Sequence, residues 1–599
     1  MCGIAGYYLN HKISKSNIYD MVRLLKHRGP DNKGFYDHEN FTGGMSRLSI
    51  MGIDNGLQPL FNEHKNVIVF YNGEIYNYEK IKKFLLKKGH FLSTNSDGEV
   101  ISHLYEEKGI NFLSYIEGMF AISLYDKRKK KLYLCRDPIG EKPLYYSKLS
   151  HNQIIYSSEL KSLKQFKKNI FEINNQSIWD FPSFNWIPEP NTIFKNVFSL
   201  PNSHYLEITN KDIKLTEYKF KETRKKTGNI NQVIHDHLKE SIKSRLMSEV
   251  PVGSFLSGGI DSSIVSFYSS KIIKNLKTYT IGFKDKEDLY HKNSDESDNA
   301  KWFANRINSE HKTIMISSKD FYNSLDKFCY AGDQPFSVSS GLGILKISEA
   351  AKSDGVKVLL SGDCADELFG GYEWYKYLSK ILISPKKTLN TNMTFLNVEY
   401  SIQDRIKALS NYTPQQIAFS LHYYATEREK NFFYTSNFNE ECQSSLRYFY
   451  EYNQNNKWTS MDFINHDRLF YLKNEMLCKL DRMTMINSIE GRVPFASPEV
   501  VGLAKKLKFN QLINSNKLKY VLKKAFEKDL PKKILNRKKH GFNVPLDYWF
   551  RNQWKDLLMH TFSEESKLYK ERYISKKSIN NFNDFYRKSK KINGQTFFS

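Results

Sequence analysis

The sequence contains no long hydrophobic run, although it extends over 599 residues. No stretch approaches the roughly 18 consecutive apolar residues that a membrane-spanning helix needs. The opening segment MCGIAGYYLNHK also lacks the basic and then apolar pattern of a secretory signal, because it turns polar at Asn10. We therefore predict a cytoplasmic protein that has no membrane partner.

Cysteine is scarce and scattered. The six cysteines form no C-x-x-C pair and have no partnering histidine at metal spacing, so the sequence supports neither a zinc site nor a disulfide framework. They are Cys2, Cys135, Cys329, Cys364, Cys442 and Cys478. Cys2 stands directly behind the initiator methionine and in front of Gly3, and it is the thiol that needs an explanation.

Acidic residues are outnumbered, since 65 Asp and Glu oppose 90 Lys and Arg and give a formal net charge of +25. Such an excess can indicate nucleic-acid binding. Here the lysines are spread along the chain, and the dense clusters are short: YDKRKKKLY, KETRKKTG and NRKKHGF. We interpret them as solvated faces that also attract ATP and acidic substrates, and we predict no nucleic-acid partner.

The chain is too long to fold around one hydrophobic core, and its length indicates about two to four domains. A first domain is predicted at 2–215. It contains strand-like runs such as NVIVFYNGEIYN and a helix, predicted from SNIYDMVRLLKHRGPD, that stops at Gly29. The polar, basic segment 216–232 reads as a linker. Residues 233–599 then alternate strands and helices, which predicts a doubly wound parallel sheet followed by a mostly helical region. An amphipathic pattern predicts a helix over 230–250.

Two glycine-containing loops each follow a predicted buried strand. The first, SGGIDSS at 257–263, leaves backbone N–H groups open in front of a helix, a geometry that cradles anions. The second, SGDCADELFGGY at 361–372, also follows a hydrophobic strand and offers acidic side chains to magnesium or a reacting centre. These are Asp363, Asp366 and Glu367. An ordinary strand-to-helix turn remains an alternative explanation of the first loop taken alone.

Together the loops resemble the ATP-pyrophosphatase family, and the DELFGGY ending resembles its asparagine synthetase branch. Further motifs follow in order: MCGIAGYY, HRGPDNKG, SRLSIMG, YNGEIYNY, SDGEV, RDPIGEKPLYY, CKLDRMTMINSIEGRVPF and NRKKHGFNVPL. Over nearly its whole length the chain resembles the glutamine-hydrolysing asparagine synthetases of the B type. The resemblance implies an α+β N-terminal-nucleophile (αββα) class II glutamine amidotransferase domain. It also implies an α/β doubly wound, parallel-sheet synthetase domain with a helical C-terminal extension.

The resemblance gives Cys2 a role as nucleophile. Removal of Met1 would place the thiol and a free α-amine on one residue. A thiol with a pKa of about 8.5 is only a few per cent ionised at neutral pH. An α-amine with a pKa of about 7.7–8.0 can accept the thiol proton, so no histidine is needed.

The glutamine pocket is likewise implied by the resemblance. The Asn72 side chain and the Gly73 N–H group would form the oxyanion hole. Arg47 would pair with the α-carboxylate of glutamine, and Asp97 with its α-ammonium. The remaining lining residues would be Leu48, Ser49, Ile50, Met51 and Glu74. Taken alone, Arg47 also fits a surface salt bridge, and Asn72-Gly73 a hairpin turn.

In the synthetase half the resemblance assigns ATP and Mg²⁺ to the two glycine loops and their flanks. The ATP-binding residues would be Leu256, Ser257, Gly258, Gly259, Asp261, Ser262, Ile281, Ser361 and Gly362. Asp261 and Asp366 would hold Mg²⁺ with pyrophosphate. Asp363, where asparagine synthetases can carry glutamate, would assist acyl-adenylate formation and ammonia attack.

A basic motif, RKKHGF, would supply the catalytic lysine. Lys539 falls where relatives place a lysine that neutralises phosphate charge. Lys538 replaces the proline of the commoner motif, so either lysine could act there. A solvated basic turn is the alternative reading of the segment.

The resulting prediction is glutamine-dependent synthesis of asparagine from aspartate and ATP, with these small molecules as partners and a homodimer left open. The same chemistry on another carboxylate, such as a sugar acid of surface-polysaccharide synthesis, is the first alternative. A tRNA-modifying ATP-pyrophosphatase is a second, although the dispersed basic residues disfavour it. An inactive scaffold is a third, although it would be expected to lose Cys2, Arg47 or the glycine loops.

Overall fold

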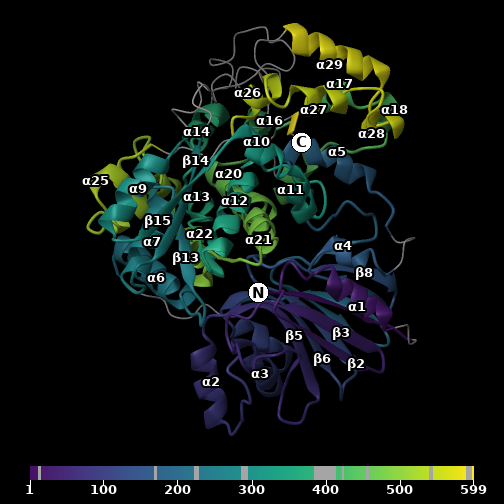
Figure 1. Ribbon diagram of the computed structural model, residues 1–599, viewed down its shortest axis with the longest axis vertical. Helices are drawn as coiled ribbons and strands as arrows, with labels where there is room; N and C mark the ends of the chain where they lie inside the picture. The colour runs from purple at the N-terminus through teal and green to yellow at the C-terminus, as the bar shows by residue number, and fades with distance from the viewer. Residues whose placement is uncertain are drawn as a thin grey trace.

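The computed structural model describes residues 1–10, 15–166, 171–220, 228–284, 295–383, 413–420, 424–453, 457–538, 544–588 and 597–598. The chain forms two halves stacked on one another, and the N-terminus lies at their boundary (Figure 1). Within the described residues, no helix combines the length and the apolar character needed to cross a membrane.

The N-terminal half is built on two six-stranded sheets. The first has the order β10 (Phe198–Ser199), β8 (Tyr145–Ser150), β9 (Gln153–Ser157), β1 (Cys2–Tyr8), β3 (Phe41–Arg47) and β2 (Asn32–His38). The second has the order β12 (Ile213–Glu217), β11 (His204–Ile208), β7 (Lys131–Arg136), β6 (Gly118–Asp126), β5 (Val67–Ile75) and β4 (Leu60–Phe61). Neighbouring strands run antiparallel.

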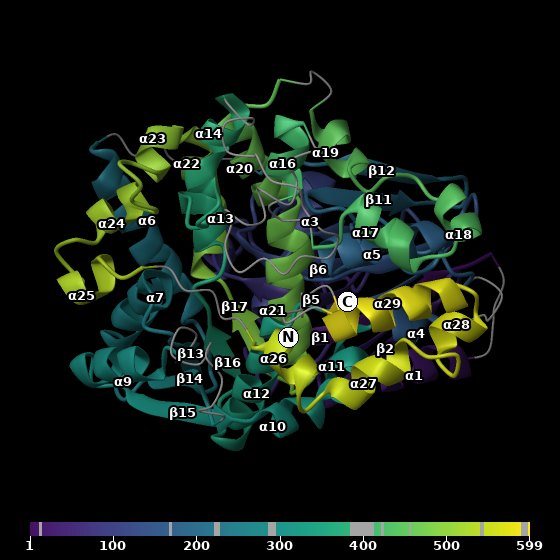
Figure 2. The same ribbon diagram turned by 90° about the horizontal axis from the view of Figure 1, so that it is seen from above.

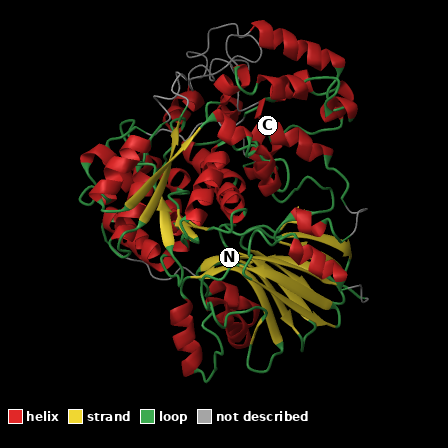
Figure 3. Ribbon diagram, in the orientation of Figure 1, coloured by secondary structure: helices red, strands yellow, loops and turns green. Residues whose placement is uncertain are grey.

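Helices cover the outer faces of both sheets (Figure 3). They are α1 (Ser16–Arg23), α2 (Tyr78–Lys87), η1 (Asp97–Glu99), α3 (Val100–Lys108), η2 (Gly109–Ser114), α4 (Leu160–Leu163) and α5 (Asn175–Phe184). Along β5, Ile68 and Phe70 join the cluster between the sheets, whereas Val67 and Val69 pack toward α2 and α3. This alternation arises because successive side chains of a strand point to opposite faces. The αββα layering implied by the resemblance is confirmed.

The C-terminal half contains a five-stranded sheet in which every pair is parallel. Its order is β15 (Glu310–Ile316), β14 (Lys277–Phe283), β13 (Val252–Phe255), β16 (Val358–Leu360) and β17 (Glu490–Arg492). The strand order reverses between β13 and β16, so a crevice opens at their carboxyl ends. Both glycine loops begin there. The predicted doubly wound sheet is confirmed.

Helices make up the remainder of this half, and the last of them lie at the end opposite the N-terminal half, which faces the viewer in Figure 2. Around the sheet are α6 (Ile230–Arg245), α7 (Ile260–Ser270), α9 (Ser297–Arg306), α10 (Ser318–Tyr322), α11 (Leu325–Gly332), α12 (Ser340–Ser353) and α13 (Ala365–Phe369). Beyond it come α14 (Tyr375–Ile383), α16 (Pro414–Ser420), α17 (Glu427–Phe433), α18 (Ser436–Glu440), α19 (Arg447–Tyr452), α20 (Ser460–Leu469), η5 (Leu472–Leu477) and α21 (Cys478–Met485). The chain continues with η6 (Pro494–Ala496), α22 (Pro498–Lys506), α23 (Phe509–Leu512), α24 (Tyr520–Ala525), α25 (Lys532–Leu535), α26 (Leu546–Arg551), α27 (Lys555–Thr561), α28 (Lys567–Lys570) and α29 (Lys576–Lys588).

Two predicted helices differ from the structure at their ends. The prediction that the first helix continues to Gly29 was wrong, because α1 ends at Arg23 and turns follow it. The helix predicted over 230–250 is present as α6 but ends at Arg245. The predicted linker 216–232 overlaps the last strand of the first half and the start of α6, and residues 221–227 within it lie outside the described residues.

Candidate active sites

Cys2 is held between the two sheets of the N-terminal half. It opens β1 directly opposite Arg47 of β3. Its backbone N–H group donates to Asn72 Oδ1 of β5, in the other sheet, at 2.9 Å. The residue is 5% exposed, and burial raises the pKa of the thiol, while the N-terminal ammonium and Arg47 act in the opposite direction. A thiol in this setting needs a base close by before it can attack.

Asn72 and Gly73 lie in the middle of β5, paired with Ala121 and Phe120 of β6. The alternative of a hairpin turn is therefore excluded. The Asn72 Nδ2 atom is buried and makes no hydrogen bond among the described residues. A buried donor without a partner costs about 1–3 kcal/mol, so this amide suits an acceptor brought by a ligand. A Cβ atom at Gly73 would lie 2.0 Å from the Met119 carbonyl oxygen, so only glycine fits.

The loop that follows β3 wraps around the Arg47 guanidinium. Arg47 Nη2 donates to the carbonyl oxygens of Met51 and Gly52 at 3.0 and 2.7 Å. Earlier in the loop, Leu48 and Ile50 enter the large core that spans both halves. The Ser49 hydroxyl is buried without a hydrogen bond among the described residues. Residues 48–51 therefore belong to the loop that surrounds the Arg47 guanidinium, and their contact with glutamine stays a prediction.

Asp97 and Glu74 form the acidic side of this region. Asp97 opens η1, accepts a hydrogen bond from the Tyr71 hydroxyl and another from Ile75 N–H at 2.7 Å. Glu74 pairs with Arg492 of the other half at 3.3 Å. Burial raises the pKa of both carboxyls. A substrate ammonium entering here would be matched by a carboxylate that is otherwise poorly solvated, which suits the role predicted for Asp97.

In the C-terminal half the two glycine loops meet in one cavity of about 460 Å³. A Cβ atom at Gly362 would lie 2.8 Å from the Ser262 backbone nitrogen, so the loops are in direct contact. The predicted residues that line the cavity are Leu256, Ser257, Asp261, Ser262, Ile281, Ser361, Gly362, Asp363 and Asp366. Gly258 and Gly259 belong to the first loop but are not among its lining residues.

Asp261 and Asp366 converge on a cation that sequence reasoning missed. Lys519 Nζ lies 2.5 Å from Asp261 Oδ2 and 2.6 Å from Asp366 Oδ1. The lysine is buried and lies just ahead of α24 with a φ of 53°, a left-handed conformation. Nothing in the local sequence NKLKYVL marks Lys519 for this position, because its two partners come from distant segments.

The other reactive groups of the second loop have different surroundings. Asp363 lines the cavity and accepts a hydrogen bond from the Ser361 hydroxyl at 2.7 Å. Glu367 lies deeper, bonded to the Tyr372 hydroxyl, and burial raises its pKa to about 8. Lys539 lies outside the described residues, whereas Lys538 is described and exposed. Asp363 and Asp366 are thus the acidic groups of this loop that line the cavity, and Glu367 is not among its lining residues.

A short strand connects the two regions. In β17, Glu490 pairs with the N-terminal ammonium of Met1 at 3.1 Å and with Arg492 at 2.5 Å. Arg492 pairs with Glu74 through its side chain, while its carbonyl oxygen accepts from Ser361 N–H at 2.8 Å. One side of β17 therefore contacts the amidotransferase residues, and its end contacts the second glycine loop. The motif EGRVPF contributes to the family resemblance, but its sequence does not predict these contacts.

Glu141 is a buried carboxyl at the boundary of the two halves. Burial raises its pKa to about 8, Asp137 and Glu490 act in the same direction, and Arg245 and Lys142 oppose them. Below its ordinary pKa of 4.5 the group is protonated in both folded and unfolded chains. Between 4.5 and about 8 the unfolded chain loses the proton first, so the free energy of unfolding falls as pH rises.

We expect Glu141→Gln to remove this dependence. The stability of the variant relative to the unsubstituted protein should rise with pH, by at most about 1.4 kcal/mol per pH unit, and level off above the folded pKa. Thermal unfolding midpoints over a pH series measure it. Exposed Glu79→Gln is the matched control, and a difference between Glu141→Gln and the unsubstituted protein that does not change with pH would contradict the prediction.

Comparisons with known proteins find related families for both halves of the chain. The family profile described as glutamine amidotransferase domain matches residues 1–219, and that described as asparagine synthase matches 233–597. Asparagine synthetase [glutamine-hydrolyzing] 1 of Bacillus subtilis is 31% identical over 582 residues, which cover 94% of this chain and 90% of the relative. Asparagine synthetase [glutamine-hydrolyzing] 3 of the same organism is 26% identical, covering 95% and 92%. A putative asparagine synthetase [glutamine-hydrolyzing] of Mycobacterium bovis is 29% identical, covering 88% and 84%. The chain belongs to the asparagine synthase family.

Proposed function

We propose that this protein makes asparagine from aspartate, using glutamine as the nitrogen donor and ATP as the energy source. Glutamine and water give glutamate and ammonia. Aspartate and ATP give β-aspartyl-AMP and pyrophosphate, and ammonia then displaces AMP. The observation that carries the proposal is the convergence of both glycine loops and Asp363 on one cavity, in a chain that also holds Cys2 between Arg47 and Asn72.

The glutaminase step follows from the surroundings of Cys2. Removal of Met1 would leave the α-amine at the nitrogen that now donates to Asn72 Oδ1, beside the thiol. The amine would take the thiol proton as sulfur attacks the amide carbon, and then pass it to the departing ammonia. Asn72 Nδ2 and Gly73 N–H would stabilise the oxyanion, an effect typically worth about 2.7–4 kcal/mol per donor. Water would hydrolyse the resulting thioester.

In the synthetase step, Leu256 and Ile281 would contact the adenine ring, and the backbone of the two loops would bind the phosphates. Asp261 and Asp366 would hold Mg²⁺, and they fit it because both are hard oxygen donors placed within reach of one cation. The ion would neutralise phosphate charge when bound. Lys519 would add positive charge beside them, and Asp363 would assist at the acyl carbon. Lys539 would neutralise negative charge on the phosphates.

The two half-reactions would belong to separate domains. We assign the glutaminase to 2–215, the synthetase to 233–599 and the connection to 216–232. Ammonia would pass internally between them. The boundary between the halves suits this transfer because Leu48, Tyr76 and Met119 of the first half share one buried cluster with the core of the second. A dry boundary keeps ammonia from being protonated and lost to solvent.

The test is release of pyrophosphate from ATP and Mg²⁺ with glutamine, in the presence of aspartate, no acceptor, or a panel of uronic acids. We expect aspartate alone to drive both pyrophosphate release and asparagine formation. If a sugar acid works and aspartate does not, the amidotransferase chemistry stands and the acceptor is wrong. If no acceptor drives pyrophosphate release, the synthetase assignment fails.

A further inference from the structure

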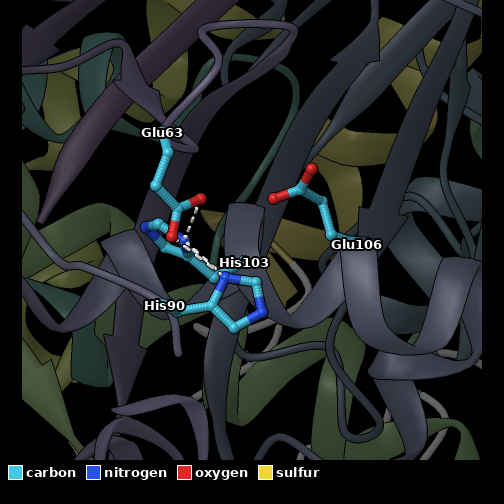
Figure 4. Close-up of side chains that lie close together, drawn as sticks. All are labelled: Glu63, His90, His103 and Glu106. Carbon is cyan, nitrogen blue, oxygen red and sulfur yellow. Dashed lines mark hydrogen bonds and ion pairs between the residues drawn. The ribbon is translucent and has the colours of Figure 1, made fainter. Parts of the chain in front are cut away.

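Glu63, His90, His103 and Glu106 lie close together in the N-terminal half (Figure 4). Residues of α3 pack in the cluster outside the sheets, whereas Cys2 lies in the cluster between them. Glu63 follows β4, His90 follows α2, and the other two lie one turn apart on α3. One potential ligand atom from each of the four lies within 4.8 Å of all the others. We propose that these residues form a binding site for a divalent transition metal of the zinc class, distinct from both reaction centres.

The distances among the two Nδ1 atoms and the Glu63 carboxylate are those of ligands around a tetrahedral ion. His90 Nδ1 lies 3.0 Å from Glu63 Oε1, and His103 Nδ1 lies 3.1 Å from Glu63 Oε2. The two Nδ1 atoms are 3.4 Å apart. Ligands about 2.0–2.1 Å from a tetrahedral metal are separated by about 3.3 Å, so a small ion fits among these atoms with little movement.

The second nitrogen of each histidine faces another carboxylate. His90 Nε2 lies 3.4 Å from Glu107 Oε1, and His103 Nε2 lies 3.6 Å from Glu99 Oε1. Glu99 is itself fixed by the backbone and hydroxyl groups of Ser93 and Thr94. Carboxylates behind metal-bound imidazoles orient the rings and increase their basicity. Here one carboxylate lies beside the Nε2 atom of each ring, while both Nδ1 atoms lie beside Glu63, and this arrangement is a separate observation from the ligand spacing.

Glu106 supplies the fourth position. Figure 4 shows its carboxylate directed toward the other three from the opposite side. Its present partner is Arg128, at 3.8 Å, in a pair that is largely exposed on the arginine side. Exposed pairs of this kind contribute about 0–1 kcal/mol, so a metal would displace Arg128 at little cost.

The residue types narrow the choice of ion. Two imidazoles and two carboxylates suit Zn²⁺, Co²⁺ and similar ions, whereas an all-oxygen set would suit Mg²⁺ or Ca²⁺. The His103 side chain is 1% exposed and Glu63 is 27% exposed, so the site has a buried floor and a side open to solvent. An ion bound there would tie β4 and α3 to the segment that contains His90 and leads into Asp97. We therefore expect the ion to stabilise the fold of the N-terminal half and to take no part in catalysis.

The experiment uses the full chain after chelator treatment and dialysis. Co²⁺ is added stepwise and its visible ligand-field absorption is recorded, and thermal unfolding is followed with and without Zn²⁺. We expect one equivalent of Co²⁺ to give a tetrahedral spectrum and Zn²⁺ to raise the unfolding midpoint. A spectrum that never saturates at one equivalent would overturn the proposal.

Variants locate the site. Glu63→Gln changes a partly exposed ligand and should weaken Co²⁺ binding at least about tenfold without loss of the fold. The double variant His90→Gln/His103→Gln should lose both the spectrum and the Zn²⁺ effect. His64→Gln, next to Glu63 and exposed, is the matched control and should behave like the unsubstituted protein. Equal binding by all variants would show that the metal is held elsewhere, and the cluster would then be an ion-pair network only.

Discussion

Replacing Cys2 by alanine removes glutamine-dependent asparagine formation and leaves ammonia-dependent formation in place. We expect a loss of at least about 10³-fold with glutamine, because the variant has no nucleophile and the remaining donors cannot form a thioester. With an ammonium salt the rate should stay within about twofold, since the ATP cavity contains no part of β1. Asparagine formation with each nitrogen source measures both.

Cys329→Ala is the control for this experiment, because that thiol is exposed and lies in α11. It should retain both activities. Mass spectrometry of the unsubstituted protein should show that Met1 has been removed. Glutaminase activity in protein that keeps Met1 would refute the role given to the α-amine, and glutaminase activity in Cys2→Ala would refute the nucleophile itself.

Lys519→Met should abolish most of the ATP-dependent reaction and spare the glutaminase. The substitution takes a buried ammonium from between Asp261 and Asp366, so two like charges remain close together and the phosphates lose a cation. We expect ammonia-dependent asparagine formation to fall at least about 10²-fold. Pyrophosphate release measured with aspartate, ATP and Mg²⁺ should fall in parallel.

Breaking a buried ion pair also destabilises a fold, typically by about 3–5 kcal/mol, so the readouts must separate the two effects. Glutaminase activity of Lys519→Met reports whether the N-terminal half remains folded, and the unfolding midpoint reports on the whole chain. Lys517→Met changes an exposed lysine two positions away and should leave the synthetase unchanged. Full synthetase activity in Lys519→Met would show that Lys519 is dispensable for ATP chemistry.

The layers of both halves could be predicted from the sequence because they depend on local patterns. The run NVIVFYNGEIYN predicts a strand, and it contains the whole of β5. The end of α1 could not be predicted in this way. The apolar spacing favours a longer helix, but the chain leaves it at Arg23 and places Arg28, which is fully buried, against Glu159 and Asp481. These partners are contributed by distant parts of the chain.

The same limit applies to the sites. The position of the glycine loops at strand ends could be predicted, because a buried strand followed by small residues is a local pattern. Their binding of phosphate stays a prediction. Lys519 and Arg492 could not. The partners of Lys519 are Asp261 and Asp366, which lie far away in the sequence, and Arg492 reaches Glu74 on the facing half. A lysine in a basic chain and an arginine in a three-residue strand carry no local signal. Only the folded arrangement identifies their partners.

Strand β17 has a thermodynamic consequence. Through Arg492 it contacts Glu74 on one side and the backbone of Ser361 on the other, so the two binding equilibria share a structural element. If nucleotide changes the affinity for glutamine by some factor, glutamine must change the affinity for nucleotide by the same factor. The coupling can therefore be measured from either ligand, and agreement between the two values is required whatever their size.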